Sequence, residues 1–136
     1  MSGERDLDAL LQTMSPELQD GVFVFCTVPD GAGTPGDTAP LLVFREREGT
    51  TLVLLREQAE RAGLAHQFAS RLITLNVHSA LDAVGFLAAV ATRLAQAGIS
   101  VNAVSAFHHD HLFVPEAMAR EALQLLRQMS ALAGSG

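Results

Sequence analysis

The chain has 136 residues, of which 49% are hydrophobic and 18% are charged, and this composition excludes a disordered tail and a charged coiled coil. The formal net charge is -6 and all nine basic residues are arginines, so the chain is a poor electrostatic match for nucleic acid or an anionic membrane. A single cysteine, Cys26, permits neither an internal disulfide nor a zinc site made of several thiolates. These features predict a soluble globular protein, built as one domain or as two small halves.

We expect neither a signal peptide nor a membrane-spanning segment in this sequence. Glu4, Asp6 and Asp8 stand where a signal peptide would have its apolar core. No apolar run approaches the roughly 20 residues that cross a membrane as a helix. We therefore expect a cytoplasmic protein without a membrane partner.

A short amphipathic helix is predicted at the start of the chain. Leu7, Leu10, Leu11 and Met14 recur at the spacing of one helical face. Because proline disfavours the helical conformation in the residue before it, the helix is expected to end before Pro16.

The sequence pattern predicts mainly strands in residues 22–62. An apolar run is followed by a stretch rich in Gly and Pro, and then by two apolar segments around a turn at Glu48-Gly49. Gly63 is well placed to end a helix. In chain order we expect a strand at 22–28, a flexible loop at 29–40, hairpin strands at 41–47 and 51–55, and a helix at 56–62.

From residue 71 the pattern reads β-α-β-β-α. Apolar and polar residues alternate first, and a strong helical stripe follows, with Ser79 and Asp82 resembling a capping box at its start. Pro115 is acceptable in the first turn of a closing helix, and the tail after Met129 is expected to fray. The expected elements are strands at 71–78, 99–107 and 111–114, and helices from 79 to 97 and from 115 to 129.

This order is most of a ferredoxin-like unit, in which two helices cover one face of an antiparallel sheet. The sixth element of such a unit, its last strand, is not visible after Met129. A strand from the N-terminal half, with 22–28 as the candidate, is therefore expected to complete the sheet.

Two parts of the sequence resemble ACT domains, small regulatory modules with a ferredoxin-like fold. Residues 82–87 read Asp-Ala-Val-Gly-Phe-Leu and residues 98–101 read Gly-Ile-Ser-Val, with Val84 where the family typically has proline. Residues 77–87 and 109–115 are similar to small, stand-alone bacterial ACT-domain proteins whose cellular role is unassigned. The resemblance implies an α+β fold with two ACT-like halves. It places a divergent N-terminal half at 1–66 and an ACT domain at 67–136.

The resemblance implies binding rather than catalysis, with an amino acid or a similar small effector as the ligand and no cofactor. Such ligands usually lie against the loop from the first strand to the first helix. Free backbone amides at a helix start suit a carboxylate, and Gly85 allows close approach. The candidate ligand-binding residues are His78, Ser79, Leu81, Asp82, Ala83, Val84, Gly85, Phe86, Asn102, His109 and His111.

Several of these candidates also have purely structural interpretations. Asp82 suits an ammonium group, but it equally suits the start of a helix. Ser79 serves as a cap or as a ligand contact, and Gly85 serves helix–sheet packing or ligand approach. Asn102 serves as a ligand amide or as a solvated residue of a strand.

The densest polar chemistry lies at residues 108–111, which read His-His-Asp-His. Imidazoles and a carboxylate suit a transition metal, but neighbouring residues of a strand point to opposite faces. His109 and His111 have the spacing of a shared face. A polar hairpin tip, a ligand site or subunit interface, and a metal site all remain open.

The preferred hypothesis is a homodimeric regulatory protein that binds an amino acid and has no nucleic-acid partner. Exposed sheet edges in ferredoxin-like units favour the dimer. No Gly-x-Ser-x-Gly elbow, phosphate-binding loop or His-Glu-x-x-His motif occurs in the chain, so we expect no enzyme. The alternatives are a structural or interaction module and, third, a metal-dependent enzyme that uses His108 to His111.

Overall fold

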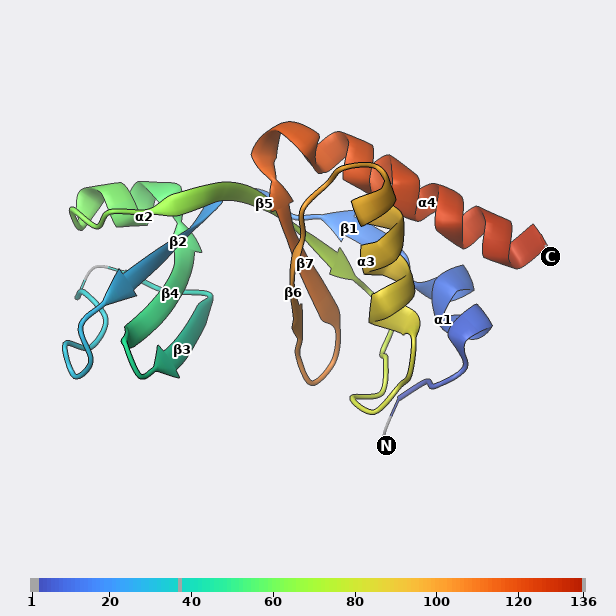
Figure 1. Ribbon diagram of the computed structural model, residues 1–136, viewed down its shortest axis with the longest axis horizontal. Helices are drawn as coiled ribbons and strands as arrows, with labels where there is room; N and C mark the ends of the chain where they lie inside the picture. Colours follow the sequence, from blue (N-terminus) through green and yellow to red (C-terminus); the bar gives the residue numbers. More distant parts are fainter. Residues whose placement is uncertain (1–2, 37, 136) are drawn as a thin grey trace. The chain divides into compact units, whose positions relative to one another are not determined.

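The computed structural model describes residues 3–36 and 38–135, which form two compact units (Figure 1). Unit 1 comprises the described residues up to Asp20 and those from Arg71 onward, and unit 2 is Gly21–Ser70. Within the described residues, no helix combines the length and apolar character that crossing a membrane requires.

The sheet of unit 1 has the strand order β1-β5-β7-β6. Its helices α1, α3 and α4 pack against one face, because their apolar stripes share a core with every second residue of β5 and β7. The elements are α1 (Leu7–Thr13), β1 (Pro16–Leu18), β5 (Gln67–Leu75), α3 (Phe86–Gln96), β6 (Asn102–Ser105), β7 (Asp110–Pro115), a 3-10 turn (Glu116–Met118) and α4 (Ala119–Ser135). The core residues are Leu10, Met14, Ile73, Leu75, Phe86, Val90, Leu94, Ile99, Leu112, Val114, Ala119, Ala122 and Leu126.

The strand that completes the sheet of unit 1 is β1. It pairs antiparallel with the end of β5, so that Pro16 faces Leu75 and Leu18 faces Ile73. The candidate strand 22–28 instead pairs with the start of β5, in unit 2. A strand of the N-terminal half therefore completes this sheet, as expected, but it is β1 and not the candidate 22–28. A three-residue strand that begins at a proline has no periodicity to reveal it.

Unit 2 has the same ferredoxin-like strand order with fewer helices. Its order is β3-β4-β2-β5, and only the first four residues of β5 belong to this unit. The other elements are β2 (Phe23–Val28), β3 (Leu42–Glu46), β4 (Gly49–Leu55) and α2 (Arg56–Arg61). No helix occurs in residues 29–36 or 38–41, where the fold would place its first helix. The buried core is Val24, Cys26, Val28, Leu52, Leu54 and Ala59.

The two strand orders confirm the predicted α+β fold with two ACT-like halves. The first helix, the strand 22–28, the hairpin and the helix 56–62 occur within one or two residues of the predicted bounds. β5 begins earlier than expected and β6 is shorter. The compact units group the described residues up to Asp20 with the C-terminal half, whereas the expected linear division lies at 66/67.

Two predictions about helix ends are wrong. α3 begins at Phe86 rather than near Ser79, and the Ser79 hydroxyl donates to the Ala80 carbonyl at 3.4 Å instead of capping a helix. The tail after Met129 is helical to Ser135. Contacts with α1 stabilise it: the Gln12 side chain donates to the carbonyl of Ala133 at 3.0 Å, and the Ser130 hydroxyl donates to the carbonyl of Gln12 at 2.8 Å. The residues that make these two contacts are far apart in the sequence, so no local pattern predicts the contacts.

Candidate ligand-binding site

Three segments of unit 1 meet at one end of its sheet. They are residues 3–6, the β5–α3 loop at 76–85 and the β6–β7 tip at 106–109, all at the lower side of unit 1 in Figure 1. The Glu4 amide donates to the His78 carbonyl at 2.8 Å, and the Ala80 amide donates to the Glu4 carbonyl at 2.9 Å. His109 Nδ1 donates to the Val77 carbonyl at 3.2 Å. The predicted loop and the histidine cluster are therefore neighbours.

The side chains of the β5–α3 loop divide into buried and exposed sets. Ser79 and Phe86 are buried, and Phe86 belongs to the core. Leu81 and Val84 are 64% and 85% exposed, respectively, and Asp82 is also exposed, whereas Ala83 is half-buried. Along the loop, the exposed carboxylate of Asp82 therefore lies between the exposed apolar side chains of Leu81 and Val84.

Gly85 precedes α3 in a left-handed conformation, with φ of +94°. A Cβ atom at this position would meet only Leu7 Cδ2, at the ordinary contact distance of 3.8 Å. The backbone conformation, rather than close helix–sheet packing, therefore favours glycine here.

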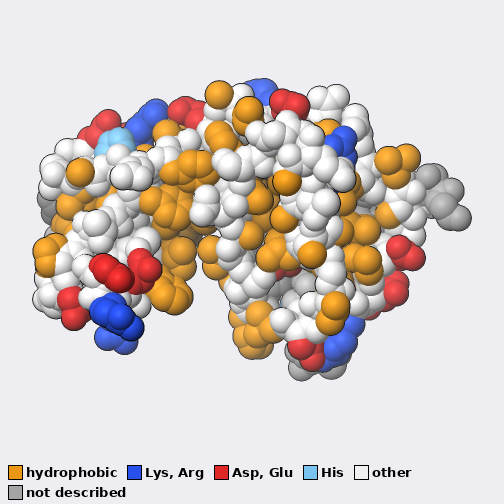
Figure 2. Space-filling model, in the orientation of Figure 1, with side chains coloured by type: hydrophobic (Ala, Val, Ile, Leu, Met, Phe, Trp, Pro, Cys, Tyr) orange, Lys and Arg blue, Asp and Glu red, His pale blue; other side chains and the backbone are white. Residues whose placement is uncertain are grey.

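Asp82 forms an ion pair with Arg5. Arg5 Nη2 lies 3.0 Å from Asp82 Oδ1 and 3.1 Å from Oδ2, and the two side chains are 52% and 70% exposed, respectively. The hydrogen bond from Arg5 lowers the pKa of the Asp82 carboxyl. Figure 2 shows acidic and basic atoms side by side at this end of unit 1. Sequence reasoning missed Arg5, because it lies 77 residues from its partner.

The aromatic rings at this end form a cluster. The ring of His78 lies 6.4 Å from that of Phe107 and 5.6 Å from that of His108, and Phe107 and His108 are 5.1 Å apart. Phe107 is 65% exposed, and Figure 2 shows hydrophobic atoms at the surface of the β6–β7 tip. The tip thus adds an exposed aromatic side chain to the apolar side chains of the loop.

His109, just before β7, and His111, within it, have ring centroids 6.4 Å apart. Asp110 is buried and accepts a hydrogen bond from Ser105 Oγ at 2.6 Å. Among the described residues, no three His, Cys, Asp or Glu side chains are grouped so that they would hold a metal ion.

His111 belongs to a row of polar groups across the sheet. Its Nδ1 lies 3.0 Å from Thr74 Oγ1, which also accepts a hydrogen bond from the Gln19 side chain at 3.3 Å. Burial lowers the pKa of His111, and the neighbouring His109 lowers it further, while Asp110 acts in the opposite direction. The native protein therefore favours the neutral imidazole.

Asn102 is set apart from the other candidates. It is exposed on β6 and pairs with Phe113, three residues before Ser105 at the end of the strand. At about 3.4 Å per residue, it lies roughly 10 Å along the strand from the β6–β7 tip. The structure brings together the loop, His109 and the added Arg5, but not Asn102.

Two family models match adjoining parts of the chain. One model of the ACT domain matches residues 2–71 and a second model of the ACT domain matches residues 67–128. Among curated proteins, none matches the chain.

Solved structures share the fold. A Vibrio cholerae protein of unknown function is 49% identical, with a TM-score of 0.80, and the match covers 91% of this chain and 95% of that one. A protein from Agrobacterium tumefaciens is 19% identical, with a TM-score of 0.72 and coverage of 85% and 87%. The regulatory subunit of aspartate kinase from Thermus flavus is 12% identical, with a TM-score of 0.64 and coverage of 84% and 95%.

Proposed function

The chain belongs to the ACT-domain family, with two ACT domains in tandem, and from this premise we propose that it is a regulatory protein that binds a free amino acid. The ligand binds at the end of unit 1 where residues 3–6, the β5–α3 loop and the β6–β7 tip meet. The protein acts in the cytoplasm through a change in its own or a partner's conformation, and it has no catalytic role.

The observation that carries this proposal is the exposed pair of Arg5 and Asp82. An amino acid is a zwitterion, so its carboxylate suits the guanidinium of Arg5 and its ammonium group suits the carboxylate of Asp82. Exposed ion pairs contribute only about 0–1 kcal/mol, so a ligand that supplies both charges can replace the internal pair. Leu81, Val84 and Phe107 then offer apolar surface to an apolar ligand side chain.

Thermal unfolding in the presence of each of the twenty common amino acids tests the proposal. A ligand at 100 times its Kd stabilises the protein by about 2.7 kcal/mol, which is readily measured. Asp82→Asn keeps the size of the side chain and Arg5→Gln keeps a polar but shorter one. Each variant removes one charge, so both should abolish the response. Glu57→Gln, at an exposed acid of unit 2, is the control and should respond like the wild type. The proposal fails if no amino acid stabilises the wild type, or if Asp82→Asn responds normally.

We also propose that two copies pair through β3, the edge strand of unit 2. Phe44, Arg45 and Glu46 are exposed along this strand, and Phe44 retains 64% of its surface. The Val53 carbonyl of β4 accepts a hydrogen bond from the Leu41 amide at 2.7 Å. The backbone N–H and C=O groups of the odd-numbered residues of β4 therefore point toward β3. Their partners in β3 include Phe44, opposite Thr51, and Glu46, opposite Gly49.

The backbone groups of Val43 and Arg45 consequently point outward from the sheet. Antiparallel pairing of two β3 strands must match outward residues with outward residues. A register centred on Arg45 would place two arginines opposite each other, which is destabilising. The register centred on Phe44 instead pairs Val43 with Arg45 of the partner subunit and brings two Phe44 rings together.

The oligomeric state tests this pairing. Phe44→Lys should convert the dimer to a monomer in sedimentation-velocity runs, because it places two like charges at the centre. Arg47→Lys, in the hairpin turn beyond β3, should leave the dimer intact. A monomeric wild type, or a dimer that survives Phe44→Lys, contradicts the proposed interface.

An interaction module without an effector is the second candidate function. The exposed Leu81, Val84 and Phe107 favour it, since exposed apolar side chains at one end of a unit are typical of protein contacts. This candidate becomes the better account if no amino acid binds and Val84→Asp abolishes association with a protein partner.

A further inference from the structure

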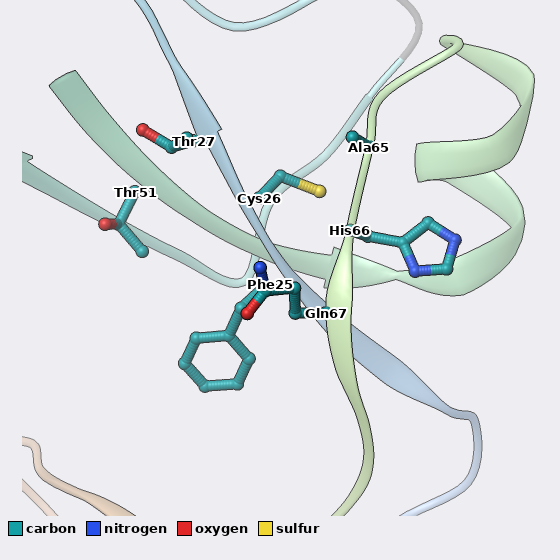
Figure 3. Close-up of a pocket in the computed structure, with 7 residues that line it drawn as sticks. All are labelled: Phe25, Cys26, Thr27, Thr51, Ala65, His66 and Gln67. Carbon is teal, nitrogen blue, oxygen red and sulfur yellow. The ribbon is translucent and has the colours of Figure 1, made fainter.

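A hollow of about 360 Å³ opens in unit 2. Figure 3 shows β2 on one side and the connection from α2 to β5 on the other. Its volume is at the lower end of the range for small-molecule sites, and none of its residues belongs to the β5–α3 loop. The lining residues are Phe25, Cys26, Thr27, Thr51, Ala65, His66 and Gln67.

The backbone of Thr27 faces this hollow. The Phe23 carbonyl accepts a hydrogen bond from Ser70 Oγ of β5 at 3.0 Å, so Phe23 faces β5. The N–H and C=O groups of one residue in an antiparallel strand point to the same side, and this side alternates along the strand. The pairing of β2 with β5 ends at Phe25 and Gln67. Thr27 lies two residues beyond Phe25, so its backbone points to the same side of β2. Its N–H and C=O groups therefore face the hollow side by side.

Phe25, the aromatic residue that lines the hollow, packs against an irregular part of β5. Between Phe23 and Phe25 the strand β2 advances two residues, whereas β5 advances three, from Gln67 to Ser70, which makes a β-bulge. Within the bulge, Phe68 has a φ of +59°, a conformation that bulky residues rarely adopt. Its ring packs edge-on against Phe25 with centroids 5.7 Å apart. The strained bulge thus braces the ring that lines the hollow.

The side chains that line the hollow include no aspartate, glutamate or arginine. Thr51 Oγ1 donates to Glu46 Oε1 at 2.6 Å, so its lone pairs remain to accept a hydrogen bond. Burial raises the pKa of the Cys26 thiol, so this side chain stays protonated at neutral pH. His66 also lines the hollow, and its Nε2 lies 3.9 Å from Glu60 Oε2, outside the lining. Because no permanently charged side chain is among the lining residues, a ligand without net charge is favoured over an anion or a cation.

We propose that this hollow binds a small, neutral, planar molecule with a hydrogen-bond donor next to an acceptor, the chemistry of a nucleobase or a cyclic amide. The donor and acceptor edge pairs with the C=O and N–H of Thr27, as a neighbouring strand would. The flat apolar body lies against Phe25. This site is independent of the amino-acid site proposed for unit 1, and it assigns each unit its own ligand class.

Binding of uracil and of 1,3-dimethyluracil to the full chain, followed by two-dimensional amide NMR, tests the proposal. Uracil should shift the amide resonances of Thr27 and Gln67. Methylation removes the donor that would bond to the Thr27 carbonyl, so dimethyluracil should bind at least about five-fold more weakly, since one hydrogen bond is worth about 1 kcal/mol. No binding of uracil, or equal binding of the two compounds, overturns the proposal.

Variants locate the site. Thr27→Pro removes the N–H that faces the hollow while leaving the pairing with β4, and it should weaken uracil binding about five-fold. Thr27→Val retains the backbone N–H and should therefore bind uracil more tightly than Thr27→Pro does. Ala65→Phe fills the hollow from an exposed position and should abolish binding, which keeps the test decisive if Thr27→Pro does not fold. Unchanged binding in Ala65→Phe, or stronger shifts from a free amino acid than from uracil at Thr27, overturns the assignment.

Discussion

Units 1 and 2 share one strand order but differ in what covers their sheets. In unit 1 three helices bury thirteen residues in the core, whereas in unit 2 the six-residue helix α2 and the sheet bury six, among the described residues. The strand order therefore does not depend on the number of helices. Backbone pairing sets the order, and the helices decide how much apolar surface is removed from water.

The largest expected effect is the loss of core packing in unit 1. Phe86 is 1% exposed and belongs to the core, so Phe86→Ala should lower the free energy of unfolding by about 3–5 kcal/mol. The matched variant in unit 2 is Leu54→Ala, at a fully buried leucine, which should cost about 2–5 kcal/mol. Urea denaturation measures both. A loss well below its range in either variant would contradict the placement of that side chain in the core of its unit.

A smaller effect is expected from glycines that hold a left-handed backbone in each unit. Gly85 and Gly63 have φ of +94° and +69°, and a Cβ atom has ordinary contact or open space at both. Alanine should therefore cost about 1–2 kcal/mol at either position, from backbone conformation alone. Equal losses in urea denaturation would sharpen the comparison, because the conformational cost is then independent of the surrounding core. No loss at Gly85 would show that α3 can begin without this conformation.

The smallest effect is a pH dependence that His111 of unit 1 contributes. The pKa of His111 is lowered in the native protein, so below about pH 6.5 the unfolded chain takes up the proton first. The contribution of neutral His111 to the free energy of unfolding is therefore fully present above this pH. It is lost as the pH drops toward the native pKa. His111→Asn retains a hydrogen-bonding atom for Thr74 and should flatten this part of the profile. His66→Gln in unit 2 is the control, and a profile changed equally by both variants would exclude His111 as the cause.

Local patterns were sufficient for many elements of both units. The helical spacing from Leu7 to Met14 predicts α1, and the apolar segments around Glu48-Gly49 predict the hairpin of β3 and β4. These predictions succeed because the residues that make the contacts are close in sequence. The strand β1 and the start of α3 were missed, because each depends on pairing with distant backbone: Leu18 with Ile73, and Glu4 with His78.

The candidate site shows the same division between local and distant information. The sequence alone indicated the loop from His78 to Phe86 and the cluster near His109, and it gave no reason to place them together. The contact between His109 and Val77 does so, and it depends on β7 lying beside β5. Arg5 enters the site only because the N-terminal segment pairs with the loop.

The sequence by itself determined the composition class, the ferredoxin-like succession of elements and the ACT resemblance, because these depend on residue type and short periodicities. Only the tertiary structure decided that β5 serves both units, that β1 closes the sheet of unit 1 and that Arg5 meets Asp82. The physical reason is that a backbone hydrogen bond or an exposed ion pair carries no mark in the sequence of its distant partner. Such partners become visible only when the chain has folded.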